Sequence, residues 1–293
     1  MTSKRPARTV ANGNGLTRRW LLASAGAAAA ATQIPRAARA QAKVAPPVII
    51  KAGTLMMSIN PTLPPLQFIN DRGEIQGLRA ELGNETAKRL GLVPEYFRID
   101  GVTTMIPGLA AKRWDMINTG IFWTEERSKI MYMVPYEGVA LSILVQRGNP
   151  QNVKTVDDFA GKRISCEQGS IEERRTKELS DMLVAKGLKA IEVRSFNNFS
   201  EAFQALRAGQ VEGTTAADAT AMFMQTRGDF TRAVSGLFAQ EACLAFTSKP
   251  LAETVAGVLT DMKKDGFYDA LMDKYGVLKL TMTQFGIKGP GPA

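Results

Sequence analysis

The chain has 293 residues, and 37 Lys and Arg residues against 28 Asp and Glu residues give it a formal net charge of +9. It contains no histidine, which excludes the usual general base, the usual metal ligand and every histidine-activated nucleophile. Its apolar content, 45% of all residues, is ordinary and suits one large or two medium domains with sizeable cores.

The first 40 residues predict a signal peptide that is removed on export. They contain seven basic residues and no acidic one. Residues 17–22 (TRRWLL) have the form of a twin-arginine motif, an apolar stretch follows over 20–31, and 38–40 (ARA) supply a small-x-small cleavage site. The apolar stretch is too short and too weakly hydrophobic to span a bilayer. We therefore expect export by the twin-arginine translocase to the periplasm; a disordered basic tail is the alternative.

Removal of this leader changes the charge argument. From Gln41 onward the chain has 30 basic and 28 acidic residues, a net charge of +2. The high pI therefore comes mostly from the leader and does not indicate a nucleic-acid partner. No second apolar run approaches membrane-spanning length, so we expect a soluble mature product.

The first half of the mature chain alternates between strand and helix patterns. Residues 48–53 (VIIKAG) predict a buried opening strand, and 70–73 (NDRG) predict a hairpin turn. An apolar stripe predicts a helix that ends at Gly91, and a shorter helix is predicted near 106–110. A β-rich run over 139–145 closes this half.

The pattern then restarts. Strands are predicted over 164–166, 211–216 and 242–246, and helices over 156–163, 170–186, 200–209, 219–227, 251–264 and 267–275. Strands that alternate with helices predict an α/β fold with a largely parallel sheet. Cys166 and Cys243 lie in apolar, strand-like runs, and the sequence leaves open whether they form a disulfide or stay separate buried thiols.

Several short motifs, each weak alone, occur in a characteristic order. They are PP at 64–65, NDRG at 70–73, the Glu81-Leu82 helix, TG at 119–120, IFWTEER at 121–127, PY at 135–136 and DMKKDGFY at 261–268. This order resembles the periplasmic solute-binding proteins of family 3, which supply polar amino acids to ABC transporters. The resemblance covers nearly all of residues 48–276.

The resemblance implies a type II periplasmic-binding-protein fold, in which two α/β lobes are joined by a two-strand hinge. The chain is expected to cross between the lobes near 138–141 and 241–244. The expected segments are a linker over 41–47, lobe I over 48–139 plus 243–286, lobe II over 140–242 and a disordered tail over 287–293.

Arg127 is the first candidate ligand-binding residue. Thr124 can cap a helix, which places Arg127 one turn in, near the mouth of the cleft. The resemblance implies that this arginine clamps a ligand carboxylate, a role that suits a planar, bidentate guanidinium. It also implies a ligand contact through the hydroxyl of Thr119 and the backbone N–H of Gly120. The alternatives are a surface ion pair for Arg127, a strand end at Thr119 and a turn at Gly120.

The second lobe offers Gly169 and Ser170 at the start of a helix. The resemblance places this loop across the cleft, where helix N-terminal N–H groups suit a carboxylate. Ser170 and Glu173 also have capping-box spacing, which needs no ligand. Both interpretations are compatible.

Other positions depart from the family pattern. They are Asn60 for an acidic residue of basic-amino-acid binders, Leu63 and Val102 for aromatic residues, Phe122 for a hydroxyl-bearing residue and Ala217 for the acid that binds the α-ammonium. Leu63 is kept as an expected ligand contact. Either Asp218 turns into the cleft while Phe122 or Trp123 forms an apolar wall, or the ligand has a carboxylate without an ammonium group.

The resemblance implies a binding protein that delivers an amino acid or a related small carboxylate to an ABC transporter permease. It implies no cofactor, no metal and no nucleic-acid partner, and we expect a monomer. A signalling partner that reads the same lobe closure is one alternative. The other is a periplasmic dehydratase acting on prephenate or arogenate, with Glu167 or Glu172 as general acid.

Overall fold

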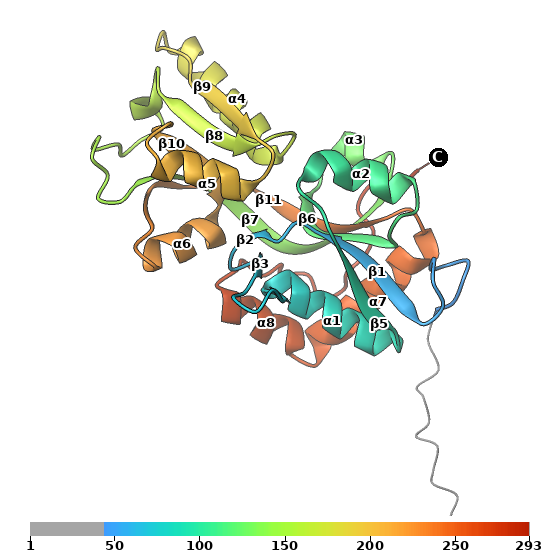
Figure 1. Cartoon of the computed structure of the whole chain (residues 1–293). Helices are drawn as coiled ribbons and strands as arrows, with labels where there is room; N and C mark the ends of the chain where they lie inside the picture. Colours follow the sequence, from blue (N-terminus) through green and yellow to red (C-terminus); the bar gives the residue numbers. More distant parts are fainter. Residues whose placement is uncertain (1–43, 293) are drawn as a thin grey trace, which may run out of the picture. The chain divides into compact units, whose positions relative to one another are not determined.

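A computed structural model describes residues 44–292 of the chain (Figure 1). The predicted signal peptide over 1–40 and the first part of the predicted linker lie outside the described residues. Between 44 and 292, no helix combines the length and the apolar character that crossing a membrane requires.

An eight-stranded sheet with the order β5-β1-β6-β11-β7-β10-β8-β9 forms the framework. Its strands are β1 (Thr54–Ile59), β5 (Val93–Arg98), β6 (Met116–Phe122), β7 (Tyr132–Gln146), β8 (Arg163–Glu167), β9 (Glu192–Phe196), β10 (Gly213–Ala217) and β11 (Phe230–Phe246). Pairing is parallel at both ends of the sheet, whereas β11 is antiparallel to β6 and β7, and β10 is antiparallel to β7. The predicted α/β class is confirmed, with parallel pairing limited to the outer strands.

Two long strands connect two groups of elements, which we call the first and second lobes. The first lobe holds β1, β5 and β6 and the second holds β8, β9 and β10, while β7 and β11 run through both (Figure 1). The pairing of β7 with β11 is irregular, with register shifts between Arg232 and Gln240 and a further one between Ala242 and Cys243. The shifts up to Gln240 lie opposite residues 139–144 of β7, close to one of the predicted chain crossings. The exact lobe boundaries given above stay predictions.

Helices and a small sheet complete the two lobes. The helices are α1 (Leu78–Leu90), α2 (Val102–Ala110), α3 (Glu125–Ser128), α4 (Ile171–Ala185), α5 (Phe199–Arg207), α6 (Asp218–Thr226), α7 (Lys249–Lys264) and α8 (Phe267–Tyr275), with a 3-10 turn at Asp157–Phe159. The small sheet contains β2 (Thr62–Leu63), β3 (Gln67–Ile69) and β4 (Ile75–Gln76), and the predicted hairpin turn joins β3 to β4.

The last two helices return to the first lobe. Both α7 and α8 contact α1. Ion pairs join Arg89 to Asp265 at 2.7 Å and Lys274 to Glu81 at 2.7 Å. The buried Tyr268 hydroxyl also donates to the backbone oxygen of Tyr136 at 2.9 Å. The C-terminal helices therefore support the strands and helix from which the cavity described below is built.

Several predicted element boundaries are wrong, and the helix predicted over 156–163 is only a 3-10 turn at Asp157–Phe159. The segment over 48–53 forms turns and bends, and the strand begins at Thr54. The reason is that the backbone N–H groups of Ile50 and Met56 donate to the Asp115 carboxylate, so part of the backbone bonding here goes to a side chain. The helix predicted from 200 begins at Phe199, because Asn198 caps it.

The end of the chain also differs from its prediction. Residues 287–293 were expected to be disordered, yet the Lys288 backbone N–H donates to Met133 O at 2.8 Å. The Lys288 ammonium pairs with Glu241 at 2.5 Å and lies 4.8 Å from the centre of the Trp123 ring. These contacts order this part of the tail. Both cysteines are free and buried, so the disulfide alternative is not formed.

Candidate ligand-binding site

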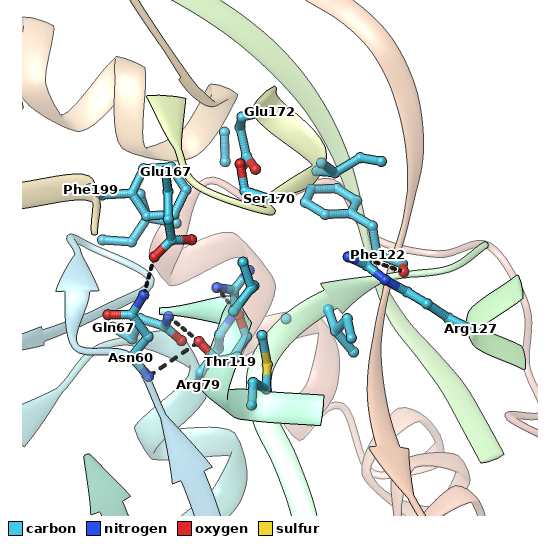
Figure 2. A pocket seen from close by; sticks show the side chains of 17 residues that line it. Asn60, Gln67, Arg79, Thr119, Phe122, Arg127, Glu167, Ser170, Glu172 and Phe199 are labelled. Carbon is cyan, nitrogen blue, oxygen red and sulfur yellow. Dashed lines mark hydrogen bonds between the residues drawn. The ribbon is translucent and has the colours of Figure 1, made fainter. Parts of the chain in front are cut away.

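A cavity with about 470 Å³ of unfilled space, part of it open to solvent, lies between the first and second lobes (Figure 2). The first lobe contributes Asn60, Leu63, Gln67, Arg79, Val102, Thr119, Gly120, Phe122 and Arg127, and the second contributes Glu167, Ser170, Glu172, Phe199 and Ala217. The structure thus brings six of the eight predicted site residues to one cavity. Gly169 and Asp218 are not among those that line it.

The end of β6 places Thr119 and Gly120 at the cavity wall. Gln67 Nε2 donates to Thr119 Oγ1 at 2.5 Å, and the Asn60 backbone N–H donates to the same oxygen at 3.3 Å. The Thr119 side chain is therefore held in one position by two donors. Gly120 has a φ of 69°, and a Cβ at this position would lie 2.1 Å from Arg79 Nη2. Only glycine fits there, which is a structural reason for Gly120 beside any contact with a ligand.

Behind this wall lies a buried charge network centred on Arg79. Its guanidinium donates to Glu137 Oε1 at 2.5 Å, to the Tyr136 hydroxyl at 2.8 Å and to Thr119 O at 2.8 Å. Burial by itself lowers the pKa of Arg79, but the charges of Glu137 and Tyr136 and the hydrogen bonds to both together outweigh it, and the pKa rises above the ordinary arginine value. Arg79 therefore lines the cavity as a cation that is already paired.

Arg127, in contrast to Arg79, has no ion-pair partner between residues 44 and 292. Thr124 Oγ1 accepts the Arg127 backbone N–H at 3.1 Å, as predicted for a helix cap, and Arg127 Nη1 donates to Phe122 O at 3.0 Å. Glu125 pairs with Lys129 instead. Burial, followed by the nearby Arg174, lowers the pKa of Arg127. The guanidinium is thus a cation at the edge of the cavity without a counterion in the described chain (Figure 2).

Ser170 and Gly169 precede α4, as predicted. Ser170 Oγ accepts the Glu173 backbone N–H at 3.1 Å, and Glu173 Oε2 accepts the Gly169 N–H at 2.6 Å. The capping interpretation is therefore confirmed. Ser170 lines the cavity, whereas Gly169 lines a neighbouring hollow that also includes Arg127 and Arg174.

The structure does not bring Asp218 to the cavity. Its carboxylate accepts the Ser142 hydroxyl and, at 3.5 Å, the Gly236 backbone N–H, and it faces a different hollow beneath the connecting strands. Ala217, one residue earlier, lines the ligand cavity. Because β10 ends at Ala217 and α6 begins at Asp218, the change of direction turns the carboxylate away.

Two acidic side chains of the second lobe do reach the cavity. Glu167 is 1% exposed and Glu172 is 3% exposed. Burial, and then the charge of Glu172, raises the pKa of Glu167 to about 9 although an Asn60 hydrogen bond of 2.6 Å lowers it. Burial also raises the pKa of Glu172, against the opposing effect of its hydrogen bonds and of Arg79 and Arg127. Neither carboxyl group pairs with a cation between residues 44 and 292. This wall can accept a cation or release a proton.

Sequence reasoning missed several lining residues, among them Gln67, Arg79, Met105 and Phe199. Arg79 carried a usable signal, because it is a charged residue beside Leu78 and close to Leu82 in the apolar stripe of α1. Gln67 and Phe199 carried none, since their positions depend on how the small sheet and α5 meet the main sheet.

The comparisons with known proteins agree with one another. The family model described as bacterial extracellular solute-binding proteins, family 3, matches residues 55–277. The L-cystine-binding protein TcyJ of Escherichia coli K12 is 27% identical over 230 residues, which is 76% of this chain and 82% of TcyJ. The histidine-binding periplasmic protein of the same strain is 28% identical over 166 residues, 57% of this chain and 59% of that relative.

Two solved structures are similar over most of the chain. An ancestral arginine-binding protein bound to arginine has a TM-score of 0.69 and 29% identity, covering 76% of this chain and 98% of that one. The ancestral amino acid-binding protein AncCDT-1, a precursor of cyclohexadienyl dehydratase, has a TM-score of 0.66 and 26% identity, covering 76% and 95%.

Proposed function

Because the chain belongs to family 3 of the bacterial extracellular solute-binding proteins, we propose that it is the substrate-binding protein of an ABC transporter. Its ligand is an amino acid or a related small carboxylate, held in the cavity between the lobes. The relatives named for cystine, histidine and arginine support this ligand class. The protein works as a monomer outside the cytoplasm and hands its ligand to a membrane permease.

The observation that carries this proposal is the state of Arg127. A half-buried guanidinium without an ion-pair partner between residues 44 and 292 is a preorganised site for a carboxylate. Thr119 and Ser170 add hydroxyl groups, Gly120 adds backbone, and Leu63 and Phe122 add apolar surface. The proposed ligand contacts therefore come from both lobes, so that closure assembles the complete site.

Closure is a hinge motion in this proposal. A ligand that touches both lobes only in the closed state shifts the equilibrium towards that state. The register shifts between β7 and β11 provide the place for bending. The permease recognises the closed form.

The twin-arginine leader is part of the proposal. Its support is the TRRWLL motif at residues 17–22, followed by an apolar stretch and a small-x-small cleavage site. The protein then folds before export and is released in the periplasm after Ala40.

The test is thermal unfolding of the purified protein with a panel of amino acids, including L-cystine, L-histidine, L-arginine and L-glutamine, and small carboxylates. A ligand at about 100 times its dissociation constant stabilises the native state by about 2.7 kcal/mol and raises the unfolding midpoint by several degrees. Arg127→Ala is expected to abolish this shift. Arg113→Ala, a cation outside the cavity, is the matched control and keeps it. No shift with any panel member would exclude the amino-acid and carboxylate classes together.

A dehydratase is the second candidate, because Glu167 lies in the cavity with a pKa raised to about 9. A carboxyl group that keeps its proton at neutral pH can give it to a leaving hydroxyl, which departs as water while prephenate or arogenate loses CO2. Turnover of either compound, absent in Glu167→Gln, would establish this activity. Absence of turnover, together with a ligand-induced shift, excludes it.

A further inference from the structure

We propose that Glu167 recognises a cationic group at the far end of the ligand, and that the ligand is an amino acid with a second, distal cation. This inference rests on the proposed function, because it assumes that the cavity binds an amino acid. It goes further by assigning the role to a carboxylate from the second lobe, in place of the acid that is missing at Asn60.

The first argument is the contact between Glu167 and Asn60. Glu167 ends β8 in the second lobe and Asn60 follows β1 in the first lobe, 107 residues apart. Asn60 Nδ2 donates to Glu167 Oε1 at 2.6 Å, across the cavity (Figure 2). The other side-chain atom of Asn60 is also engaged, because Oδ1 accepts the Thr62 hydroxyl at 2.9 Å. The amide therefore holds one carboxyl oxygen of Glu167, and Oε2 has no hydrogen-bond donor between residues 44 and 292.

The second argument is the charge balance of the cavity wall. Four ionisable side chains line the cavity, and Arg79 is already neutralised by Glu137. Arg127, Glu167 and Glu172 are left, which is one cation against two carboxyl groups. A buried carboxylate is costly unless it is paired, which is why Glu167 keeps its proton while no cation pairs with it. A ligand with one carboxylate and two cationic groups pairs all three.

The third argument is the placement of the two carboxyl groups relative to Arg127. Arg127 comes from the first lobe, Glu172 lines the same cavity from the second, and Glu167 is bonded to Asn60 at 2.6 Å. In the proposal, Arg127 binds the ligand carboxylate and Glu172 binds the α-ammonium. The distal group then extends to Glu167, beside Asn60 and Phe199.

The inference also predicts how ligand preference depends on pH, because binding of a cation is linked to loss of the Glu167 proton. Burial and Glu172 from α4 hold the proton on Glu167, and the other charged groups of the wall are Arg79 from α1 and Arg127 from α3. A bound cation needs the ionised form, whereas an uncharged group can bond to the protonated form. The preference for a cationic ligand over its neutral isostere should therefore increase as the pH rises from 6 towards about 9.

The experiment compares L-arginine with L-citrulline, in which a neutral urea replaces the guanidinium without changing the length of the chain. Calorimetric titration of the wild-type protein is expected to show about 10- to 100-fold tighter binding of L-arginine, the difference typical of a charge-assisted hydrogen bond. In Glu167→Gln this preference is lost, because affinity for L-arginine falls while affinity for L-citrulline changes less than about threefold.

A double variant in which Asn60 and Glu167 exchange their side-chain types distinguishes recognition of the distal cation from a purely structural link between the lobes. Asn60→Asp combined with Glu167→Gln moves the carboxylate to the first lobe and the amide to the second. We expect this double variant to recover at least part of the preference for L-arginine. Equal loss of both ligands in Glu167→Gln, without recovery in the double variant, would overturn the inference.

The outcomes also separate this inference from the proposed function. If the wild-type protein binds L-citrulline or a neutral amino acid at least as tightly as L-arginine, the inference is wrong and the amino-acid-binding function stands. If no amino acid or carboxylate of the panel binds, the proposed function fails and the inference fails with it.

Discussion

The two walls of the cavity are built differently. The first-lobe wall is a connected polar network in which Gln67 and Asn60 hold Thr119, and Arg79 is bonded to Glu137 behind it. The second-lobe wall presents buried carboxyl groups that lack a counterion in the described chain. The comparison indicates that the first lobe supplies a rigid surface, while the second supplies buried carboxyl groups that can ionise when a cationic ligand group pairs with them.

The largest effect is expected from removing the buried ion pair between Arg79 and Glu137, which lies behind the first-lobe wall. Arg79→Met leaves Glu137 buried and without its cation, which should lower the free energy of unfolding by about 3–5 kcal/mol. Denaturant titration without ligand measures this change. Tyr136→Phe keeps the ion pair and removes two hydrogen bonds, one accepted from Arg79 Nε and one donated to Glu137 Oε1, and should cost about 2 kcal/mol. A loss below about 1 kcal/mol in Arg79→Met would show that the network does not make the first wall rigid.

Gly120→Ala tests the same wall at the backbone. The new Cβ would lie 2.1 Å from Arg79 Nη2, at a φ of 69°, so the wall must shift. We expect a loss of about 2–3 kcal/mol in stability, together with weaker ligand binding. Gly257→Ala in α7 is the matched control, because a Cβ there has nothing within 4 Å, and it should be stabilising by up to about 1 kcal/mol. Similar stabilities for the two variants would contradict this assignment.

The second-lobe wall can be tested through the pH dependence of the free energy of unfolding. The pKa of Glu167 is about 9 in the folded protein against 4.5 for an ordinary glutamate. Between these values the folded protein binds more protons than the unfolded chain, so the free energy of unfolding falls as the pH rises. One such group gives a slope of at most about 1.4 kcal/mol per pH unit.

Denaturant titrations of the ligand-free protein between pH 5 and pH 9 measure that slope. Glu167→Gln should flatten it, whereas Glu253→Gln, on the exposed part of α7, should leave it unchanged. The same slope in Glu167→Gln and in the wild-type protein would mean that this carboxyl group is ionised in the folded state.

The smallest expected effect concerns the cap of α4. Ser170→Ala removes the acceptor for the Glu173 N–H and should cost about 1 kcal/mol. Ser248→Ala at the start of α7 removes a cap of the same kind and should cost a similar amount. Ligand affinity separates the two variants, because only Ser170 lines the cavity. Equal affinities would remove Ser170 from the proposed site.

Much of the fold could be predicted from local patterns in the sequence. The stripe that ends at Gly91, the Thr124 cap and the α4 cap at Ser170 each depend on a few neighbouring residues, and each is present in the structure. The order of the motifs led to the two-lobed type II fold, which the family match and the similar structures confirm. The opening strand was misplaced because Asp115, 65 residues away from Ile50, takes part of its backbone bonding.

The site could be predicted only in part. Arg127, Thr119 and Ser170 line the cavity, and they could be named in advance because they belong to short motifs. The contact between Asn60 and Glu167 could not be predicted, because it joins side chains that are 107 residues apart and lie in different lobes. Asp218 was misjudged because the neighbouring residue faces the cavity and the helix start turns the carboxylate aside.

The irregular pairing of β7 with β11 has a mechanical consequence. Where the register shifts, between Arg232 and Gln240, the ribbon lacks a regular ladder of hydrogen bonds. In the closure proposed above, the ribbon would bend at that place with little loss of hydrogen bonding, while the two paired strands would keep the lobes in the same alignment.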